Sequence, residues 1–169
     1  RPCYYYIDED VIVAASERAA IRTTFNVGEN EVKELMPGNA LIVHEDGSYE
    51  IESVVAAKER KACSFERIYF SRGSDEKIYK ERKALGFNLS EQVLNAIDFD
   101  LKNTIFSYIP NTAEVAFLGL QKGMQMYLNK IKIERILSWG KDYDEEKLEE
   151  MINRRIRVGK IAIKDVKMR

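Results

Sequence analysis

The stretch TIFSYIPNTAEVAFLGL (residues 104–120) decides how the second half of the chain is expected to fold. β-branched and aromatic residues predict a strand over 104–109, and a short polar turn with Asn111 and Thr112 follows. An apolar pattern with helical spacing then begins at Glu114. A turn between a strand and a helix often binds anions in an open α/β sheet, because backbone N–H groups at the helix N-terminus point at the ligand. The alternative is that Asn111 or Thr112 only caps the helix.

Helical patterns lie on both sides of this turn. The segment GSDEKIYKERKALGFNLSEQVLNAIDFDL predicts a long helical region capped by Ser74, with Gly86 as a break or kink. Further helices are expected over about 111–129 and near 143–153, and the alternating tail 154–169 predicts an edge or connecting strand. This order of helices and strands predicts an α/β unit with a parallel sheet.

The first third of the chain is dominated by strand patterns. YYYID and VIVAASE predict two strands around a turn of acidic residues, and Ser16 is expected to cap a short helix in SERAAIRTTF. ALIVHEDGSYEI predicts a hairpin with strands at 40–44 and 49–54 around an Asp-Gly turn. The single histidine, His44, is expected beside that turn.

Length and composition exclude several classes of protein. The chain has 169 residues, of which 45% are hydrophobic and 33% charged, which fits one ordinary domain or two partial ones and excludes a disordered chain. The net charge of -1 predicts no overall attraction to nucleic acid or to anionic lipid. No apolar run approaches the roughly 20 residues of a membrane span, and a cytoplasmic protein is expected. The first residue is Arg rather than Met, so the chain is interpreted as an internal fragment.

The two cysteines have no spacing typical of a metal site. Cys3 and Cys63 are expected to be reduced thiols. Cys63 begins CSFERIYFSRGSD, which is interpreted as a half-buried strand or extended arm over 64–72, and its thiol is expected to be buried and structural.

The C-terminal tail is strongly basic. Residues 154–169 hold seven Lys or Arg residues against one acid, a local net charge of +6. Such a tail attracts a polyphosphate or a nucleic-acid backbone. The alternative is a solvated face balanced by the preceding acidic run DYDEEKLEE, and nucleic-acid binding is the weakest of the functions considered.

Several of these motifs together resemble glutamine phosphoribosylpyrophosphate amidotransferases (amidophosphoribosyltransferases). In that family Cys-x-Phe-Glu-x-x-Tyr-Phe-x-Arg leads into a helix with an Arg-x-x-x-Gly step, and the matching residues are Cys63, Phe65, Glu66, Tyr69, Phe70, Arg72, Arg82 and Gly86. Upstream, Arg1-Pro2, Ala15-Ser16-Glu17 and Pro37-Gly38 match the family's final glutaminase strands. The likeness spans nearly the whole chain and is weakest over about 121–165, where this sequence is longer than the usual pattern.

The resemblance implies a fold and a reaction. Residues 1–60 are expected to be the end of an Ntn-type glutaminase β-sandwich, and residues 61–169 the first part of a type I phosphoribosyltransferase α/β domain that lacks the PRPP loop. The combined fold class is therefore α+β followed by α/β. Family members transfer glutamine-derived ammonia to phosphoribosyl pyrophosphate (PRPP) with Mg²⁺, giving 5-phosphoribosylamine for purine synthesis.

Four residues carry the family's site roles. Thr112 matches a hydroxyl residue that contacts Mg²⁺ near PRPP, although Asn111 replaces the usual acid before it. Lys167 and Arg169 resemble the start of the flexible loop that closes over PRPP. Cys63 stands where some members place the first thiolate of a 4Fe–4S cluster and others an unliganded Cys.

The fragment itself is expected to be inactive, because the resemblance places the glutaminase nucleophile and the PRPP loop outside it. The parent is expected to be a homo-oligomer, and uncovered sheet edges are expected to favour self-association. The alternative is a non-catalytic paralogue that senses a sugar phosphate or acts as an interaction subunit.

Overall fold

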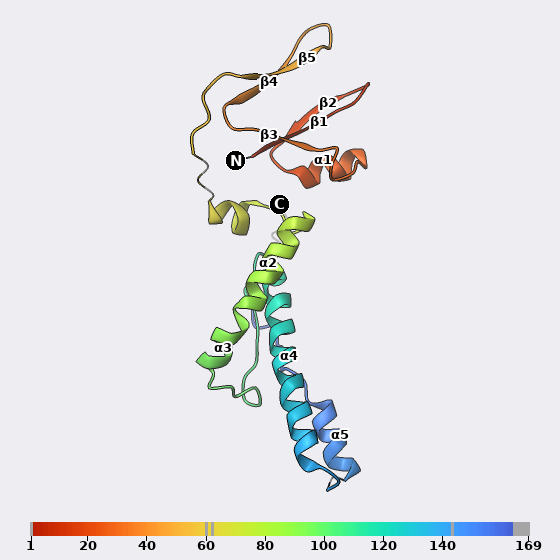
Figure 1. The fold of residues 1–169 in the computed structure, drawn as a ribbon, viewed down its shortest axis with the longest axis vertical. Helices are drawn as coiled ribbons and strands as arrows, with labels where there is room; N and C mark the ends of the chain where they lie inside the picture. The colour runs from red at the N-terminus through yellow and green to blue at the C-terminus, as the bar shows by residue number, and fades with distance from the viewer. Residues whose placement is uncertain (1, 60, 62, 143, 164–169) are drawn as a thin grey trace. The chain divides into compact units, whose positions relative to one another are not determined.

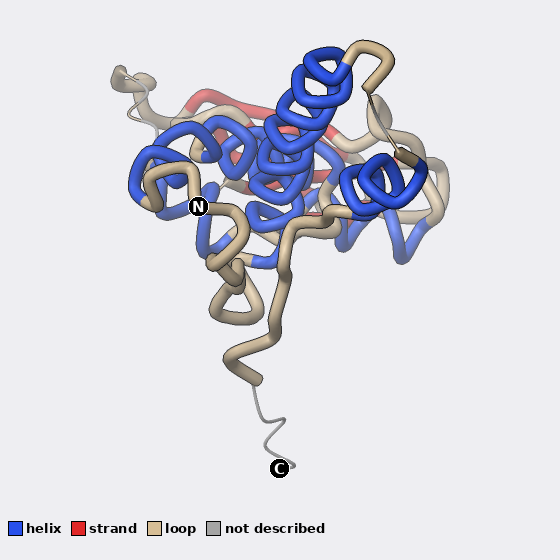
Figure 2. Tube along the Cα trace, turned by 90° about the horizontal axis from the view of Figure 1, so that it is seen from below, coloured by secondary structure: helices blue, strands red, loops and turns tan. Residues whose placement is uncertain are grey.

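The computed structural model describes residues 2–59, 61, 63–142 and 144–163. Helices account for 44% of them and strands for 15%, and both sheets are antiparallel, so the chain has a general α+β character (Figure 2). The chain divides into two compact units, Arg1–Ile78 and Tyr79–Arg169, and each is described by itself. Among the described helices, none combines the length and the apolar character that a membrane span needs.

The first unit begins with a small antiparallel sheet. Strands β1 (Cys3–Ile7), β2 (Ile12–Ala15) and β3 (Lys33–Leu35) lie in the order β2-β1-β3 (Figure 1). The turn between β1 and β2 is held by the carboxylate of Asp8, which accepts hydrogen bonds from the backbone N–H groups of Asp10 and Val11. The predicted pair of strands is therefore confirmed.

The predicted hairpin is also confirmed. Strands β4 (Asn39–Val43) and β5 (Tyr49–Ser53) pair in antiparallel register. Between them Asp46 accepts hydrogen bonds from the backbone N–H and the hydroxyl of Ser48, which closes the turn. His44 lies beside this turn, as expected, with its Nε2 3.3 Å from a carboxylate oxygen of Glu50.

Helix α1 (Arg18–Phe25) follows β2 and begins without the predicted cap. The N-cap position belongs to Glu17, and no side chain forms a capping hydrogen bond, so the prediction that Ser16 caps the helix is wrong. The helix ends at Asn26, whose φ of 52° is left-handed. Asparagine tolerates this conformation better than most residues, so it is well suited to end the helix. Ile21 is the buried residue of the helix.

The segment 64–72 is helical rather than extended. Its centre is a π-helical turn, η1 (Glu66–Phe70), closed by a hydrogen bond from the Ser71 N–H to the carbonyl of Glu66. Most side chains of this segment are exposed rather than half-buried. The predicted strand is therefore wrong, because alternating aromatic and charged residues fit one helical turn as well as a short strand.

Helices α2 (Glu76–Asn88) and α3 (Ser90–Ala96) form the predicted long helical region. Its first turn is capped by Asp75, whose carboxylate accepts from the N–H groups of Lys77 and Ile78, so the prediction of Ser74 as the cap is off by one residue. Gly86 lies inside α2 and does not break it.

The second unit is built on the long helix α4 (Glu114–Trp139), with α5 (Glu145–Asn153) after it. Both helices were predicted, although α4 extends ten residues past the predicted end at 129. Asp144 caps α5 by accepting a hydrogen bond from the Lys147 N–H at 2.7 Å. One apolar cluster forms the core of this unit; its buried members are Leu94, Leu101, Phe106, Phe117, Met124 and Leu128.

Three glycines let the helices of the second unit pack closely. A Cβ on Gly119 would lie 1.8 Å from the Lys83 carbonyl oxygen, and one on Gly86 would lie 1.7 Å from the Ala116 carbonyl oxygen. A Cβ on Gly123 would lie 2.3 Å from the Ser90 hydroxyl oxygen. Glycine is therefore required at these positions for α4 to pack this closely against α2 and α3.

Residues 104–109 form no regular strand. Within the described part of the tail they pair with it only through a parallel bridge between Phe106 and Val158, in which the Phe106 N–H donates to the Arg157 carbonyl and the Gly159 N–H donates to the Phe106 carbonyl. The two segments predicted as strands therefore lie side by side and in parallel at this bridge, but neither forms a strand among the described residues. The described residues nevertheless contain no parallel sheet, and the predicted α/β unit is not formed by them.

Candidate functional site

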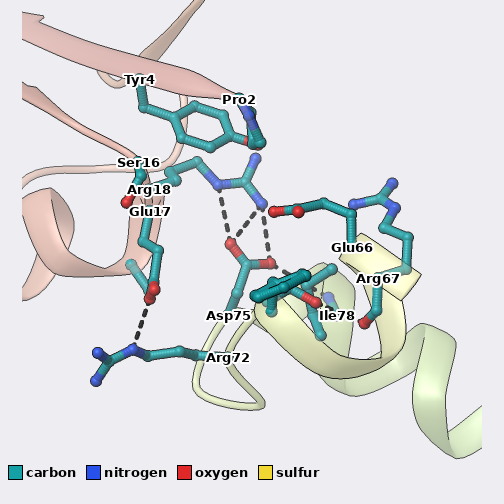
Figure 3. A pocket seen from close by; sticks show the side chains of 13 residues that line it. Pro2, Tyr4, Ser16, Glu17, Arg18, Glu66, Arg67, Arg72, Asp75 and Ile78 are labelled. Atoms are coloured by element: carbon teal, nitrogen blue, oxygen red, sulfur yellow. Dashed lines mark hydrogen bonds and ion pairs between the residues drawn. The ribbon is translucent and has the colours of Figure 1, made fainter. Parts of the chain in front are cut away.

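A small polar pocket lies in the first unit, where α1 and the beginning of α2 meet the π-helical turn (Figure 3). Its volume is about 60 Å³. The side chains that line it come from segments far apart in sequence and include Tyr4, Glu17, Arg18, Glu66, Arg67, Arg72 and Asp75. Charged side chains of both signs therefore surround a hollow the size of a few water molecules.

The centre of this pocket is an ion pair between Arg18 and Asp75. The Arg18 guanidinium donates from Nη2 to both carboxylate oxygens of Asp75, at 2.8 and 3.0 Å, and from Nε to Oδ2 at 3.2 Å. The same guanidinium lies 5.9 Å from the centre of the Tyr4 ring. Because Asp75 also caps α2, one carboxylate holds the N-terminus of α2 and the beginning of α1 together.

Burial and charge shift the ionisation of these groups. Burial acts to raise the pKa of Asp75, but the hydrogen bond from Arg18 and the backbone N–H groups of Ile78 and Lys77 outweigh it, so the pKa lies below its usual 3.8. Burial raises the pKa of Tyr4, and the nearby carboxylate of Glu34 acts in the same direction. Asp75 is therefore a carboxylate at neutral pH, fixed by its partners and not poised to transfer a proton.

A second ion pair lines the pocket. Nε of Arg72 lies 2.6 Å from a carboxylate oxygen of Glu17 (Figure 3). Glu17 belongs to the Ala-Ser-Glu motif, and Arg72 ends the motif that starts at Cys63. These two motifs are far apart in the sequence but contact one another in the folded unit. The sequence alone did not indicate this contact.

An exposed aromatic cluster occupies the π-helical turn. Phe65 stacks on Tyr69 with ring centres 5.1 Å apart, and Phe70 meets both rings edge-on at 5.6 and 5.3 Å. Cys63 lies just before the cluster, and its thiol is free and exposed. The expectation of a buried structural thiol at Cys63 is therefore wrong, whereas both cysteines are free as expected.

Thr112 lies in the turn before α4, in the second unit. It is exposed, and the N-cap position of α4 belongs to Ala113, which has no side-chain capping bond. Neither the Asn111 nor the Thr112 side chain therefore caps the helix, so the alternative that one of them serves only as a helix cap is wrong. The Glu114 N–H donates to the Asn111 carbonyl, and the Tyr108 hydroxyl donates to the Glu114 carboxylate at 3.2 Å.

The metal groups implied by the resemblance do not fit this chain alone. Within the described ranges no three His, Cys, Asp or Glu side chains converge to hold a metal ion, so Thr112 supplies at most a single hydroxyl ligand for Mg²⁺. A 4Fe–4S cluster needs four thiolates, and the sequence has two cysteines. Cys63 alone therefore cannot hold such a cluster.

The remaining predicted site residues, Lys167 and Arg169, lie outside the described residues. The described part of the basic tail is anchored at Arg157, whose guanidinium donates to the Lys102 carbonyl at 3.1 Å. Further along, the Ile161 N–H donates to the Ser107 hydroxyl at 3.2 Å. These contacts fix the tail beside residues 104–109, which lead into the Thr112 turn.

Comparisons with protein-family models, with curated proteins and with solved structures gave no match.

Proposed function

We propose that this chain is part of an amidophosphoribosyltransferase-type enzyme, which transfers glutamine-derived ammonia to PRPP. The observation that carries the proposal is the ion pair between Glu17 and Arg72. Glu17 and Arg72 each belong to a motif that resembles the family, and the ion pair brings these two motifs into contact. A chance resemblance of short motifs gives no reason for such a contact.

The proposed reaction replaces one bond at the sugar. Ammonia released from glutamine attacks C1 of PRPP, a C–N bond forms, and the bond from C1 to the pyrophosphate oxygen breaks. Pyrophosphate leaves as an anion, and Mg²⁺, when bound, neutralises its charge. The proton that the new amine loses passes to solvent or to a base outside the described residues.

The residues of this chain would position the phosphates. The Thr112 hydroxyl is exposed at the start of α4 and is free to offer an oxygen ligand. Lys167 and Arg169 would attract the pyrophosphate through charge. In this proposal residues 1–60 are the glutaminase side and residues 61–169 the phosphoribosyl side of a cytoplasmic enzyme.

The test is an assay of the whole polypeptide that carries this chain. It is incubated with PRPP, Mg²⁺ and either glutamine or ammonium, and release of pyrophosphate is measured. Release with both nitrogen sources, together with formation of glutamate from glutamine, supports the proposal. Binding of PRPP without any release would instead support a non-catalytic sugar-phosphate sensor, and an absence of both binding and release would overturn both functions.

A further inference from the structure

A groove of about 350 Å³ lies in the second unit between α2 and α4. Its residues recur at helical spacing on both helices: Lys80, Lys83, Ala84 and Phe87 on α2, and Gly119, Lys122 and Met126 on α4. Residues three, four and seven apart share one face of a helix, so each helix turns a single face to the groove. The two helices lie side by side in Figure 1.

The groove depends on the close approach of the two helices at Gly119. A Cβ there would meet the carbonyl oxygen of Lys83 at 1.8 Å and the backbone nitrogen of Phe87 at 2.9 Å. Because no side chain rises from this position, the floor of the groove is backbone and small side chains. Its walls are formed by the longer side chains on either side.

The groove has a positive rim. Lys80, Lys83 and Lys122 come from two different helices and line the same hollow. Among the described residues that line it, none is Asp or Glu. Lys83 is half-buried, and its ammonium lies 5.6 Å from the centre of the Tyr79 ring. Lys83 and Lys122, from two different helices, give the rim a local positive potential, although the net charge of the chain is only -1.

The same groove has an apolar wall. Phe87 and Met126 line it, and they are 37% and 53% exposed. An aromatic ring and a flexible thioether provide a surface that adapts to apolar groups of various shapes. Apolar contact beside a cluster of positive charges is what an anion with an attached apolar group requires.

We propose that this groove binds small amphiphilic anions, with a phosphate or carboxylate at the lysines and an apolar group against Phe87 and Met126. An ammonium rim alone would bind inorganic phosphate weakly, because surface charges are well solvated. An apolar wall alone would bind uncharged aromatic compounds. The juxtaposition of the two predicts that a molecule with both parts binds more tightly than either part. This inference does not depend on the proposed function, since it uses neither Thr112 nor the pocket of the first unit.

The experiment is a titration of the 169-residue chain, followed by ¹⁵N NMR, with 1-naphthyl phosphate, 1-naphthol and inorganic phosphate. Naphthyl phosphate is expected to shift amides at residues 83–87 and 119–126 and to bind about tenfold or more tightly than either of the other two probes. Equal affinity for naphthyl phosphate and naphthol, or shifts confined to other residues, would overturn the proposal.

Variants separate the groove from general surface charge. Lys122→Gln is expected to weaken naphthyl phosphate binding by about two- to fivefold, as the loss of one exposed ion pair predicts. Lys130→Gln is the matched control, because Lys130 is an exposed lysine of the same helix outside the groove. Phe87→Ala is expected to weaken naphthyl phosphate but not inorganic phosphate. An equal loss in Lys122→Gln and Lys130→Gln would contradict a specific site, and Lys80→Gln repeats the test if Lys122→Gln fails to fold.

Discussion

The guanidinium of Arg18 and the carboxylate of Asp75 form a bidentate pair across 57 positions of sequence, with Nη2 2.8 Å from Oδ2. Both side chains are largely buried, at 14% and 13% exposed. Such a pair is stronger than a surface ion pair, because its geometry is fixed and little water competes for the charges. It joins α1 to the first turn of α2 within the first unit.

Replacement of Asp75 by Asn is expected to lower the free energy of unfolding of the first unit by about 2 kcal/mol at neutral pH, since the variant loses a charge-assisted bond and leaves Arg18 with the longer contact from Nη1 to Glu29, at 3.5 Å. Denaturation by urea, followed by circular dichroism, measures this difference. Glu50→Gln is the matched control, because Glu50 pairs with His44 at an exposed site where both side chains are about half exposed. If both variants lose the same free energy of unfolding, the pair of Arg18 and Asp75 stabilises the chain no more than an exposed ion pair does.

The contribution of Asp75 is expected to depend on pH with a defined sign. Its pKa in the folded chain is lower than the usual 3.8, so folding favours the charged form. The stabilisation is therefore complete above the unfolded pKa and is lost as the pH falls through the folded pKa. The difference in unfolding free energy between the chain and Asp75→Asn should be largest near about pH 6 and should shrink below pH 3.8. A difference that stays constant down to about pH 2.5 contradicts this assignment.

Gly119 is expected to tolerate no side chain. In Gly119→Ala the new methyl group would lie 1.8 Å from the Lys83 carbonyl oxygen, so α4 must move away from α2. Alanine has a higher helix propensity than glycine. The loss of close packing is nevertheless expected to lower the free energy of unfolding by about 2 kcal/mol or more in total. Gly159→Ala is the control, because its new methyl group meets only a side-chain methyl of Ile105, at 3.0 Å. Thermal unfolding of the two variants measures the contrast, and equal melting temperatures would show that the helices adjust freely.

Local signals in the sequence were sufficient for the two strand pairs of the first unit, β1 with β2 and β4 with β5. The Asp-Gly turn and the alternating residues beside it predicted β4 and β5, because a two-strand hairpin is specified by its own turn. The strand β3 was missed, since its three residues, Lys33 to Leu35, carry two charges and pair only through contact with β1. The segment 64–72 was misassigned because its pattern fits a helical turn as well as a strand.

Tertiary contacts decided what the sequence left ambiguous in the second unit. Gly86 resembles a helix break by propensity, but it lies where α2 meets the backbone of α4, and this packing retains the helix. Residues 104–109 have the composition of a strand, yet a strand needs a partner, and among the residues that the structure describes they have one only at the bridge between Phe106 and Val158. In the first unit, the approach of Glu17 to Arg72 was likewise not predictable, because no local pattern encodes a contact across so many residues.

Cys63 is expected to be the reactive thiol of the chain. It is exposed, whereas Cys3 is partly buried in strand β1, so a thiol reagent should reach Cys63 first. Titration with Ellman's reagent is expected to show a fast phase that disappears in Cys63→Ser and persists in Cys3→Ser. A fast phase that persists in Cys63→Ser would show that Cys3 is the accessible thiol.

Incubation of the chain with iron and sulfide is expected to give no 4Fe–4S absorption, because the chain has two of the four thiolates required.

Thr112 provides the sharpest test of the proposed phosphoribosyl site. In the whole enzyme, Thr112→Val is expected to lower kcat/KM for PRPP in the ammonia-dependent reaction by about tenfold, as the loss of one charge-assisted contact predicts. Thr112→Ser keeps the hydroxyl and should retain most of the activity. Glutamine hydrolysis should change in neither variant, because in this proposal that reaction belongs to the glutaminase domain and Thr112 to the phosphoribosyltransferase domain. Thr112 is exposed and forms no cap, so the unfolding free energy should change by less than about 0.5 kcal/mol. If Thr112→Val and Thr112→Ser have equal activity with PRPP, the hydroxyl takes no part in the reaction.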